Sequence, residues 1–260
     1  MLTEADRKKA AQMLLTAEQD RKPVVQLSNT WPQITIDDAY AIQREVIAAK
    51  VAAGAKVIGH KIGLTSKAMQ LSSQIDEPDY GHLLDYMVLN DGAKVAHDRF
   101  CVPRVELEFA FVLGKPLKGP GVGLVDVLRA TEYVVTAIEI IDARVQNPRK
   151  IFDTVADNAA AAMIVVGGRP VGPNEVDLRW AGGMMYRNAE IEETGVAAGV
   201  LGHPAMGIAW LANKVGVFGT TLEPGNLMLA GSFTRPVWAN KGDTLRADFG
   251  PLGSVAVQFV

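Results

Sequence analysis

The stretch that most constrains this chain is VELEFAFVLG, residues 105–114, an apolar strand that carries two acidic side chains. Side chains alternate between the two faces of a strand, so the apolar odd-numbered residues share one face while Glu106 and Glu108 share the other. The Cα atoms of the two glutamates are then about 6.5–7 Å apart. Two carboxylates this close repel each other where water is scarce, so this face must either meet solvent or share a cation.

A second apolar strand, YVVTAIEIIDARV at residues 133–145, supplies a third carboxylate. Glu139 is its only charged residue before Asp142, and alternation gives Glu139 apolar neighbours on its own face. Three carboxylates on two strands, at least one of them buried, suit a hard divalent cation such as Mg²⁺ or Mn²⁺. The Glu-x-Glu spacing also occurs on exposed strands, so the pattern alone leaves the solvated alternative open.

Two segments near the N-terminus have the spacing of helices. Residues 3–20 alternate charged and apolar groups at helical intervals, and residues 35–54 do the same. In the second segment, Thr35 and Asp38 stand at the spacing of a capping box. We therefore expect a small helical region at residues 1–55.

The remainder of the chain reads as β structure. From residue 56 on, turns that contain Gly and Pro separate short apolar runs, which predicts many antiparallel strands in a sandwich or barrel-like core. Helical patterns interrupt these runs at 123–131 and 203–219. The expected class is thus α+β, with a large β-rich domain at residues 56–260.

Charge and composition exclude some classes of function. The formal net charge of −3, without a long run of one sign, argues against nucleic-acid binding, which usually needs a concentrated basic face. No apolar stretch reaches the roughly 18–20 residues of a membrane helix, and the charged N-terminus lacks the apolar centre of a signal peptide. The single cysteine, Cys101, cannot form an internal disulfide, which fits a reducing cytoplasm. We expect a cytoplasmic protein that binds neither nucleic acid nor membranes.

Several motifs follow one another along the chain: GHKIGLTSKAMQ (59–70), EPDYGHLLD (77–85), VPRVELEFAFVLGKPL (102–117), AIEIIDAR (137–144), FDTVADNAA (152–160), GVAAGVLGHPAMGIAWLAN (195–213) and GSFTRPV (231–237). The series resembles the 2-oxo acid hydratase and decarboxylase branch of the fumarylacetoacetate hydrolase superfamily. Within this branch, the chain is most similar to hydratases of 2-oxohept-3-ene-1,7-dioate. The resemblance implies a mixed β-sandwich or roll core with the active site in its mouth.

The resemblance also implies roles for the acidic residues and one lysine. Glu106, Glu108 and Glu139 would hold a divalent metal, Mg²⁺ or alternatively Mn²⁺. Lys61 would face the substrate, where it stabilises an enolate or moves a proton, and a pKa lowered by burial would suit the proton transfer. Without the resemblance, Lys61 reads as a lysine that snorkels to the surface. Asp79, in a turn sequence, becomes a candidate acid or base.

Five further residues are expected to bind the substrate: Ser73, Tyr80, Asp157, Asn158 and Thr234. Tyr80 is part of the EPDYG loop, which the resemblance implies lies over the active site. Ser73 precedes this loop, and the alternative for Ser73 is a solvated loop serine. Asp157 and Asn158 could instead orient a water or the Lys61 ammonium, or cap a turn. The hydroxyl of Thr234 could bind the substrate carboxylate.

The implied activity is that of a Mg²⁺-dependent hydro-lyase in the meta-cleavage degradation of aromatic compounds. It would add water to a 2-hydroxy-2,4-dienoate or its 2-oxo-enoate tautomer, with 2-oxohept-3-ene-1,7-dioate giving 4-hydroxy-2-oxoheptanedioate. The alternatives are a 4-oxalocrotonate decarboxylase, which would use the same bound 2-oxo acid, and a non-catalytic partner subunit. We also expect a homo-oligomer, and association with a pathway enzyme stays open.

The tail of the substrate is a separate question. A diacid needs a second anchor, which Arg104, Arg144, Arg149 or Lys150 could supply because they lie near the motifs. Each of the four also reads as a surface charge. The segment ARVQNPRKIF (143–152) looks shorter than in the hydratases of the seven-carbon diacid, so a monoacid dienoate remains an alternative.

Overall fold

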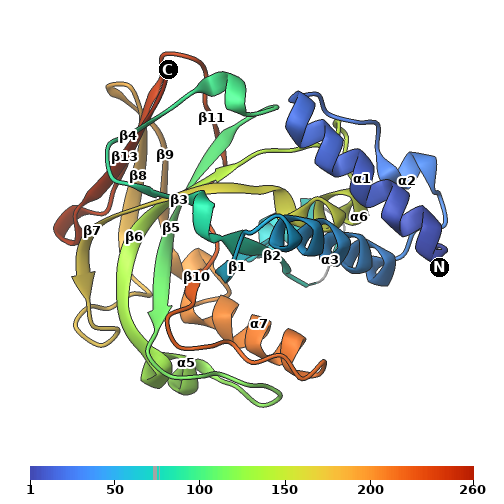
Figure 1. Ribbon diagram of the computed structural model, residues 1–260. Helices are drawn as coiled ribbons and strands as arrows, with labels where there is room; N and C mark the ends of the chain where they lie inside the picture. The colour runs from blue at the N-terminus through green and yellow to red at the C-terminus, as the bar shows by residue number, and fades with distance from the viewer. Residues whose placement is uncertain (73–74, 76) are drawn as a thin grey trace.

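The structure is a computed structural model of the chain, and it describes residues 1–72, 75 and 77–260 (Figure 1). The α-helices are α1 (Glu4–Asp20), α2 (Leu27–Thr30), α3 (Ile36–Ala52), α4 (Lys67–Ser72), α5 (Leu124–Ala130), α6 (Ile151–Ala156) and α7 (Ala205–Gly216). Short 3₁₀ helices are η1 (Asp85–Met87), η2 (His97–Arg99), η3 (Asn158–Ala160), η4 (Ala197–Gly199) and η5 (Gly250–Leu252).

The strands form two sheets. They are β1 (Val57–Gly63), β2 (Asp79–Leu84), β3 (Val88–Asn90), β4 (Ala93–Val95), β5 (Arg104–Leu113), β6 (Thr131–Ile141), β7 (Ala161–Val171), β8 (Gly182–Arg187), β9 (Glu190–Val196), β10 (Leu227–Leu229), β11 (Val237–Trp238), β12 (Thr244–Asp248) and β13 (Ser254–Phe259). The larger sheet has the order β2-β1-β10-β5-β6-β7-β3, with β11 also paired to β5. The smaller sheet has the order β4-β13-β12-β8-β9.

Both sheets mix parallel and antiparallel pairs. In the larger sheet β1–β10 and β3–β7 are parallel and β6 runs antiparallel to both β5 and β7, while in the smaller sheet β13–β4 is parallel and β12 runs antiparallel to β13 and β8. Figure 1 shows β5, β6 and β7 as long curved strands, with the smaller sheet at the left and helices α1, α2, α3 and α6 gathered at the right. The expected α+β class with a mixed, curled β core is confirmed. Among the described residues, no helix is both long and apolar enough to cross a bilayer.

The N-terminal helices begin where the sequence predicts. The hydroxyl of Thr35 accepts a hydrogen bond from the backbone N–H of Asp38, and the Asp38 carboxylate accepts one from the Thr35 N–H, both at 3.2 Å. On the buried side of α3, Gln43 Nε2 donates to the carbonyl oxygens of Tyr80 and Val155, each at 2.9 Å. These bonds tie α3 to β2 and α6, which belong to the predicted β-rich domain. The division of the chain into a helical region at 1–55 and a β-rich domain at 56–260 therefore stays a prediction.

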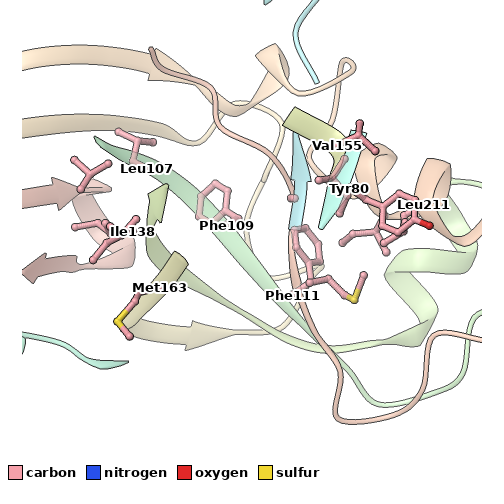
Figure 2. Close-up of a cluster of buried hydrophobic side chains, with 14 of the residues drawn as sticks. Tyr80, Leu107, Phe109, Phe111, Ile138, Val155, Met163 and Leu211 are labelled. Carbon is pink, nitrogen blue, oxygen red and sulfur yellow. The ribbon is translucent and has the colours of Figure 1, made fainter. Parts of the chain in front are cut away.

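The centre of the larger sheet is built by alternation along β5. The odd-numbered side chains of this strand lie in the main hydrophobic core, where Val105 and Leu107 are fully buried. Figure 2 shows Leu107, Phe109 and Phe111 within this cluster, together with Ile138 and Met163. The even-numbered residues face the other side of the sheet, and they include the two glutamates.

Three short α-helices were not predicted by the pattern of the sequence, and the shortest of them, α2, spans 4 residues. Both α4 and α6 span 6 residues, which is less than two turns. A helix this short shows no recognisable hydrophobic period, so its formation depends on tertiary contacts. Asp153 shows this for α6, because its carboxylate accepts hydrogen bonds from the backbone N–H and the hydroxyl of Ser28, at 2.9 and 2.8 Å.

Candidate metal centre and active site

Strand pairing brings the three glutamates to one place. Glu106 on β5 is paired directly with Glu139 on β6, and Glu108 follows on the same face opposite Ala137. Each of the three offers a carboxylate oxygen, and these oxygens all lie within 4.8 Å of one another. The cluster expected from the sequence is therefore present in the structure.

The cluster is poorly solvated, and this changes its acid–base behaviour. Glu108 and Glu139 are each 1% exposed, while Glu106 is half-buried. Burial raises the pKa of Glu106 to about 7, with Lys61 opposing the rise and Glu139 adding to it. Burial and the two neighbouring carboxylates raise the pKa of Glu108 well above its usual range. Three acidic groups held this way call for a compensating cation.

The residues present fit a divalent metal ion. The backbone N–H of Gly231 donates a hydrogen bond of 2.8 Å to Glu108 Oε2. The other oxygen of that carboxylate and Glu139 Oε1 are buried and have no hydrogen-bond partner among the described residues. Buried oxygens that are unsatisfied and converge on one centre are the donor set that Mg²⁺, Mn²⁺ or Ca²⁺ prefers. The acidic cluster could thus bind a divalent metal.

Lys61 lies on the same face of the sheet as the glutamates. It is paired with Leu229 on β10, which is in turn paired with Ala110, two residues beyond Glu108 on β5. Its Nζ lies 3.2 Å from Glu139 Oε2, and the residue is 4% exposed. Lys61 is therefore not a snorkelling surface lysine in this structure.

The acidic neighbours of Lys61 decide its charge state. Burial by itself would lower the pKa of Lys61, but the carboxylates of Glu139, Asp79 and Glu106 more than offset this, and the pKa is raised. The lowered pKa that would suit proton transfer by Lys61 is therefore opposed by the carboxylates nearby. As a charged ammonium, Lys61 can stabilise negative charge and can donate a proton.

Asp79 completes the group. It is 2% exposed and is paired with Gly63 across the antiparallel strands β1 and β2. A Cβ atom at Gly63 would overlap Asp79 Oδ1 and would lie 3.4 Å from Lys61 Nζ, so the glycine leaves room for these two side chains to approach each other. Burial raises the pKa of Asp79 while Lys61 lowers it, and the net effect is a rise. Asp79 is thus a carboxyl group able to hold a proton beside Lys61.

Tyr80 does not lie with these groups, contrary to the sequence expectation. It is paired with Ile62, and alternation along β2 turns its side chain to the opposite face from Asp79. There its ring stacks on Tyr40 with the ring centres 4.8 Å apart, and Figure 2 shows it among buried apolar side chains. Direct substrate contact by the Tyr80 side chain is therefore not supported by the strand geometry.

Asp157 and Asn158 are engaged with the protein itself. The Asp157 carboxylate accepts hydrogen bonds from Arg144, through its Nε and, at 2.8 Å, through its backbone N–H. Asn158 accepts a bond of 2.7 Å from the His82 N–H and donates one of 2.9 Å to the His82 carbonyl, which fixes β2 beside η3. Asn158 thus supports the strand that carries Asp79, whereas Asp157 holds Arg144, and contact of either residue with substrate stays a prediction.

The two remaining candidates are Thr234 and Ser73. Thr234 is half-buried, and its hydroxyl lies 3.4 Å from the Ser232 hydroxyl in the loop that follows Gly231. Because Gly231 contacts Glu108 directly, this loop borders the acidic cluster. The substrate contact of Thr234 stays a prediction, and Ser73 lies outside the described residues.

Two glycines that the sequence analysis did not single out help to position the side chains of the site. Gly231 donates the backbone hydrogen bond to Glu108 and has a φ of 113°, and a Cβ atom there would collide with Thr65. Gly63 makes space for Asp79. An isolated glycine beside a short apolar run indicates a close backbone approach, so this signal was available in the sequence.

Comparison with known proteins gives consistent results. The family model described as fumarylacetoacetate (FAA) hydrolase C-terminal matches residues 56–260. A 2-oxo-hept-4-ene-1,7-dioate hydratase from Escherichia coli is 57% identical over 257 residues, covering 96% of each chain. A 2-hydroxyhexa-2,4-dienoate hydratase from Comamonas testosteroni is 39% identical, covering 95% of each.

A solved structure is similar to this chain in both sequence and fold. The 4-oxalocrotonate decarboxylase from Pseudomonas putida G7, complexed with magnesium and adipate, superposes with a TM-score of 0.97. It is 36% identical, and the match covers 100% of this chain and 99% of that one. The proteins similar to this chain thus include both hydratases and a decarboxylase.

Proposed function

This chain belongs to the fumarylacetoacetate hydrolase family, and from that premise we propose that it is a divalent-metal-dependent hydratase of 2-oxo-enoates. The proposed substrate is a 2-hydroxy-2,4-dienoate or one of its 2-oxo tautomers, and the proposed product is a 4-hydroxy-2-oxo acid. The 2-oxo-3-ene and 2-oxo-4-ene forms of a seven-carbon diacid differ by one proton shift through the same dienol. The 3-ene diacid expected from the sequence and the 4-ene diacid in the name of the 57% identical relative are therefore tautomers of each other.

The observation that carries this proposal is the convergence of Glu106, Glu108 and Glu139 on one centre, with buried oxygens that no described residue satisfies. These residues would hold the metal, which when bound supplies a Lewis acid that polarises the 2-oxo group of the substrate. Magnesium is the metal we propose, because a relative was solved with magnesium and the donor set contains only carboxylates.

Lys61 and Asp79 would act on the substrate directly. Water adds at C4 of the conjugated enoate, and negative charge develops on the C2 oxygen, where the Lys61 ammonium can stabilise it. Protonation at C3 then completes the reaction. Asp79, with its pKa raised by burial and its position beside Lys61, is the proposed proton carrier for this step.

The rival activity is the decarboxylation of 4-oxalocrotonate. The same residues could serve it, because a bound 2-oxo acid is common to both reactions. We favour hydration because the hydratase relative is 57% identical, whereas a decarboxylase from Pseudomonas putida is 37% identical over a similar share of the chain.

One incubation separates the two activities. The purified protein is given Mg²⁺ with either 2-hydroxyhepta-2,4-diene-1,7-dioate or 4-oxalocrotonate, and both CO₂ release and the 4-hydroxy-2-oxo acid are measured. We expect the hydrated product from the seven-carbon diacid, without CO₂. Release of CO₂ from 4-oxalocrotonate without hydration of the dienoate would reverse the assignment.

A non-catalytic partner subunit is the remaining alternative. It would keep the fold without turnover, and intact Glu106, Glu108, Glu139 and Lys61 speak against it. Absence of both activities together with absence of metal binding by calorimetry would favour it. Assembly as a homo-oligomer, association with a pathway enzyme and location in the cytoplasm stay predictions.

A further inference from the structure

A cavity of about 210 Å³ lies on the same face of the larger sheet as the acidic cluster. Its wall includes Arg104, Ile141 and Trp238, and strand pairing places these three side by side across β6, β5 and β11. The Arg104–Ile141 pair is the next same-face pair after Glu106–Glu139. The cavity therefore begins one step along the strands from the proposed metal centre.

Two arginines contribute to this cavity without an anionic partner. Neither Arg104 nor Arg149 forms an ion pair with any residue that the structure describes. Arg149 is half-buried, and its Nη1 is fully buried yet has no hydrogen-bond partner among the described residues. The Arg104 guanidinium lies 5.3 Å from the centre of the Trp238 ring, which holds it at the cavity wall.

The positive charge at the cavity is only partly compensated. Burial and the nearby Arg104 lower the pKa of Arg149, and the carboxylates of Asp157 and Asp153 oppose this fall without cancelling it. The one carboxylate in the wall, that of Asp142, is already engaged, since it accepts hydrogen bonds from the backbone N–H groups of Cys101 and Val102 at 2.9 and 2.6 Å. An anion bound between the arginines would supply the missing partner.

The other cations near the motifs are not available for this role. Arg144 is buried, and its guanidinium is bonded to the Asp157 carboxylate and to the carbonyl oxygens of Asp157 and Ala161. Lys150 is exposed to solvent. Of the four residues that the sequence offers as a second anchor, the structure leaves Arg104 and Arg149.

We propose that Arg104 and Arg149 bind the distal carboxylate of the substrate and make the chain select dicarboxylic 2-oxo acids over monocarboxylic ones. This inference rests on the proposed function, since it assumes that the 2-oxo end of the substrate lies at the acidic cluster. Adjacent same-face residues on a strand are about 6.5–7 Å apart. The ends of an extended seven-carbon chain, with six zigzag bonds of about 1.5 Å, are about 7.5 Å apart, which is close to one such step.

The test compares two unreactive ligands that differ by one carboxylate, 2-oxoheptanedioate and 2-oxoheptanoate. Their affinities for the Mg²⁺-supplemented protein are measured by calorimetry, for the wild type and for Arg149→Met. We expect the substitution to weaken binding of the diacid about 10- to 100-fold, as loss of a charged hydrogen bond does. Binding of the monoacid should change less than about 3-fold, within the scatter of such measurements.

Two further variants complete the design. Arg169→Met removes an exposed arginine on β7 and should leave both affinities unchanged. Arg149→Lys keeps the charge but loses the planar guanidinium, so it should retain part of the preference for the diacid. Circular dichroism spectra establish that each variant is folded before its affinities are compared.

The outcomes separate this inference from the proposed function. Equal affinity of the wild type for the two ligands, equal weakening of both by Arg149→Met, or no effect on either would overturn the subsite. Selective binding of the diacid by a protein that hydrates no dienoate would leave the subsite standing and remove the proposed activity. Binding of neither ligand would overturn both.

Discussion

Replacement of Glu106 by glutamine should have opposite effects on stability with and without metal. The side chain keeps its shape but loses its charge. In the metal-free protein, the wild-type carboxylate is held near two others and is partly buried, so its ionised form destabilises the fold. In the metal-bound protein, the same carboxylate is a ligand, so its loss weakens metal binding.

The size of the first effect follows from the structure. The pKa of Glu106 is about 7 in the folded chain against an ordinary 4.5. Because the folded value is the higher one, the folded state retains a proton that the unfolded state has lost, and stability falls as pH rises from 4.5 through 7. At pH 8 the penalty is about 3 kcal/mol, at about 1.4 kcal/mol for each unit of pKa. Repulsion between two charges 4.8 Å apart is also about 3 kcal/mol at an effective dielectric constant near 20.

Thermal unfolding at pH 8 is the assay, carried out in EDTA and in excess Mg²⁺ or Mn²⁺. In EDTA, Glu106→Gln should melt about 6–12 °C above the wild type, given a shift of about 2–4 °C for each kcal/mol. Excess metal should stabilise the wild type, by about 2.7 kcal/mol at 100 times Kd, and stabilise the variant far less.

The matched control is Glu132→Gln, which neutralises an exposed glutamate on the strand that carries Glu139. It should behave as the wild type in both conditions. The reasoning would be refuted if the Glu106→Gln protein were less stable than the wild type in EDTA. It would also be refuted if metal stabilised the variant as much as it stabilises the wild type.

Three other substitutions test the remaining groups. Lys61→Met should lower kcat/KM about 10²- to 10⁴-fold, the range typical of a positioned acid–base group, and a loss below about 3-fold in steady-state kinetics would count against its role. Gly63→Ala should displace the Asp79 carboxylate and abolish hydration while metal binding, measured by calorimetry, persists; full activity would contradict the proposed place of Asp79. His60→Phe should flatten the pH dependence of stability between pH 4.5 and 6.5 by up to about 1.4 kcal/mol per pH unit in urea unfolding. Burial lowers the pKa of His60 to about 3, so the unfolded state takes up the proton first, and stability is lost as pH falls from 6.5; an unchanged slope would show that His60 is not buried as a neutral ring.

Local patterns were sufficient to predict much of the site. Alternation along residues 105–114 placed Glu106 and Glu108 on one face, and the lone charge of Glu139 indicated a buried carboxylate. The capping box at Thr35 likewise depends on residues close in sequence. The register of β5 and β6, however, sets Glu106 opposite Glu139. No local pattern predicts this register, because strand pairing joins residues far apart along the chain.

The errors have the same origin. EPDYG reads as a turn, but β2 begins at Asp79, so the alternation that separates Asp79 from Tyr80 could not be applied in advance. The partner of Asp157 is Arg144, and the raised pKa of Lys61 depends on acidic side chains from three other strands. The motif resemblance identified these residues, and tertiary contacts decide what each one touches.

The central claim is that Glu106, Glu108 and Glu139 share one divalent ion. Anomalous diffraction from crystals soaked in Mn²⁺ tests it directly. We expect a single strong peak bounded by the three side chains, at about 2.0–2.3 Å from an oxygen of each, as hard divalent ions require. A peak elsewhere, or carboxylates that turn away from one another with no ion between them, would contradict the account.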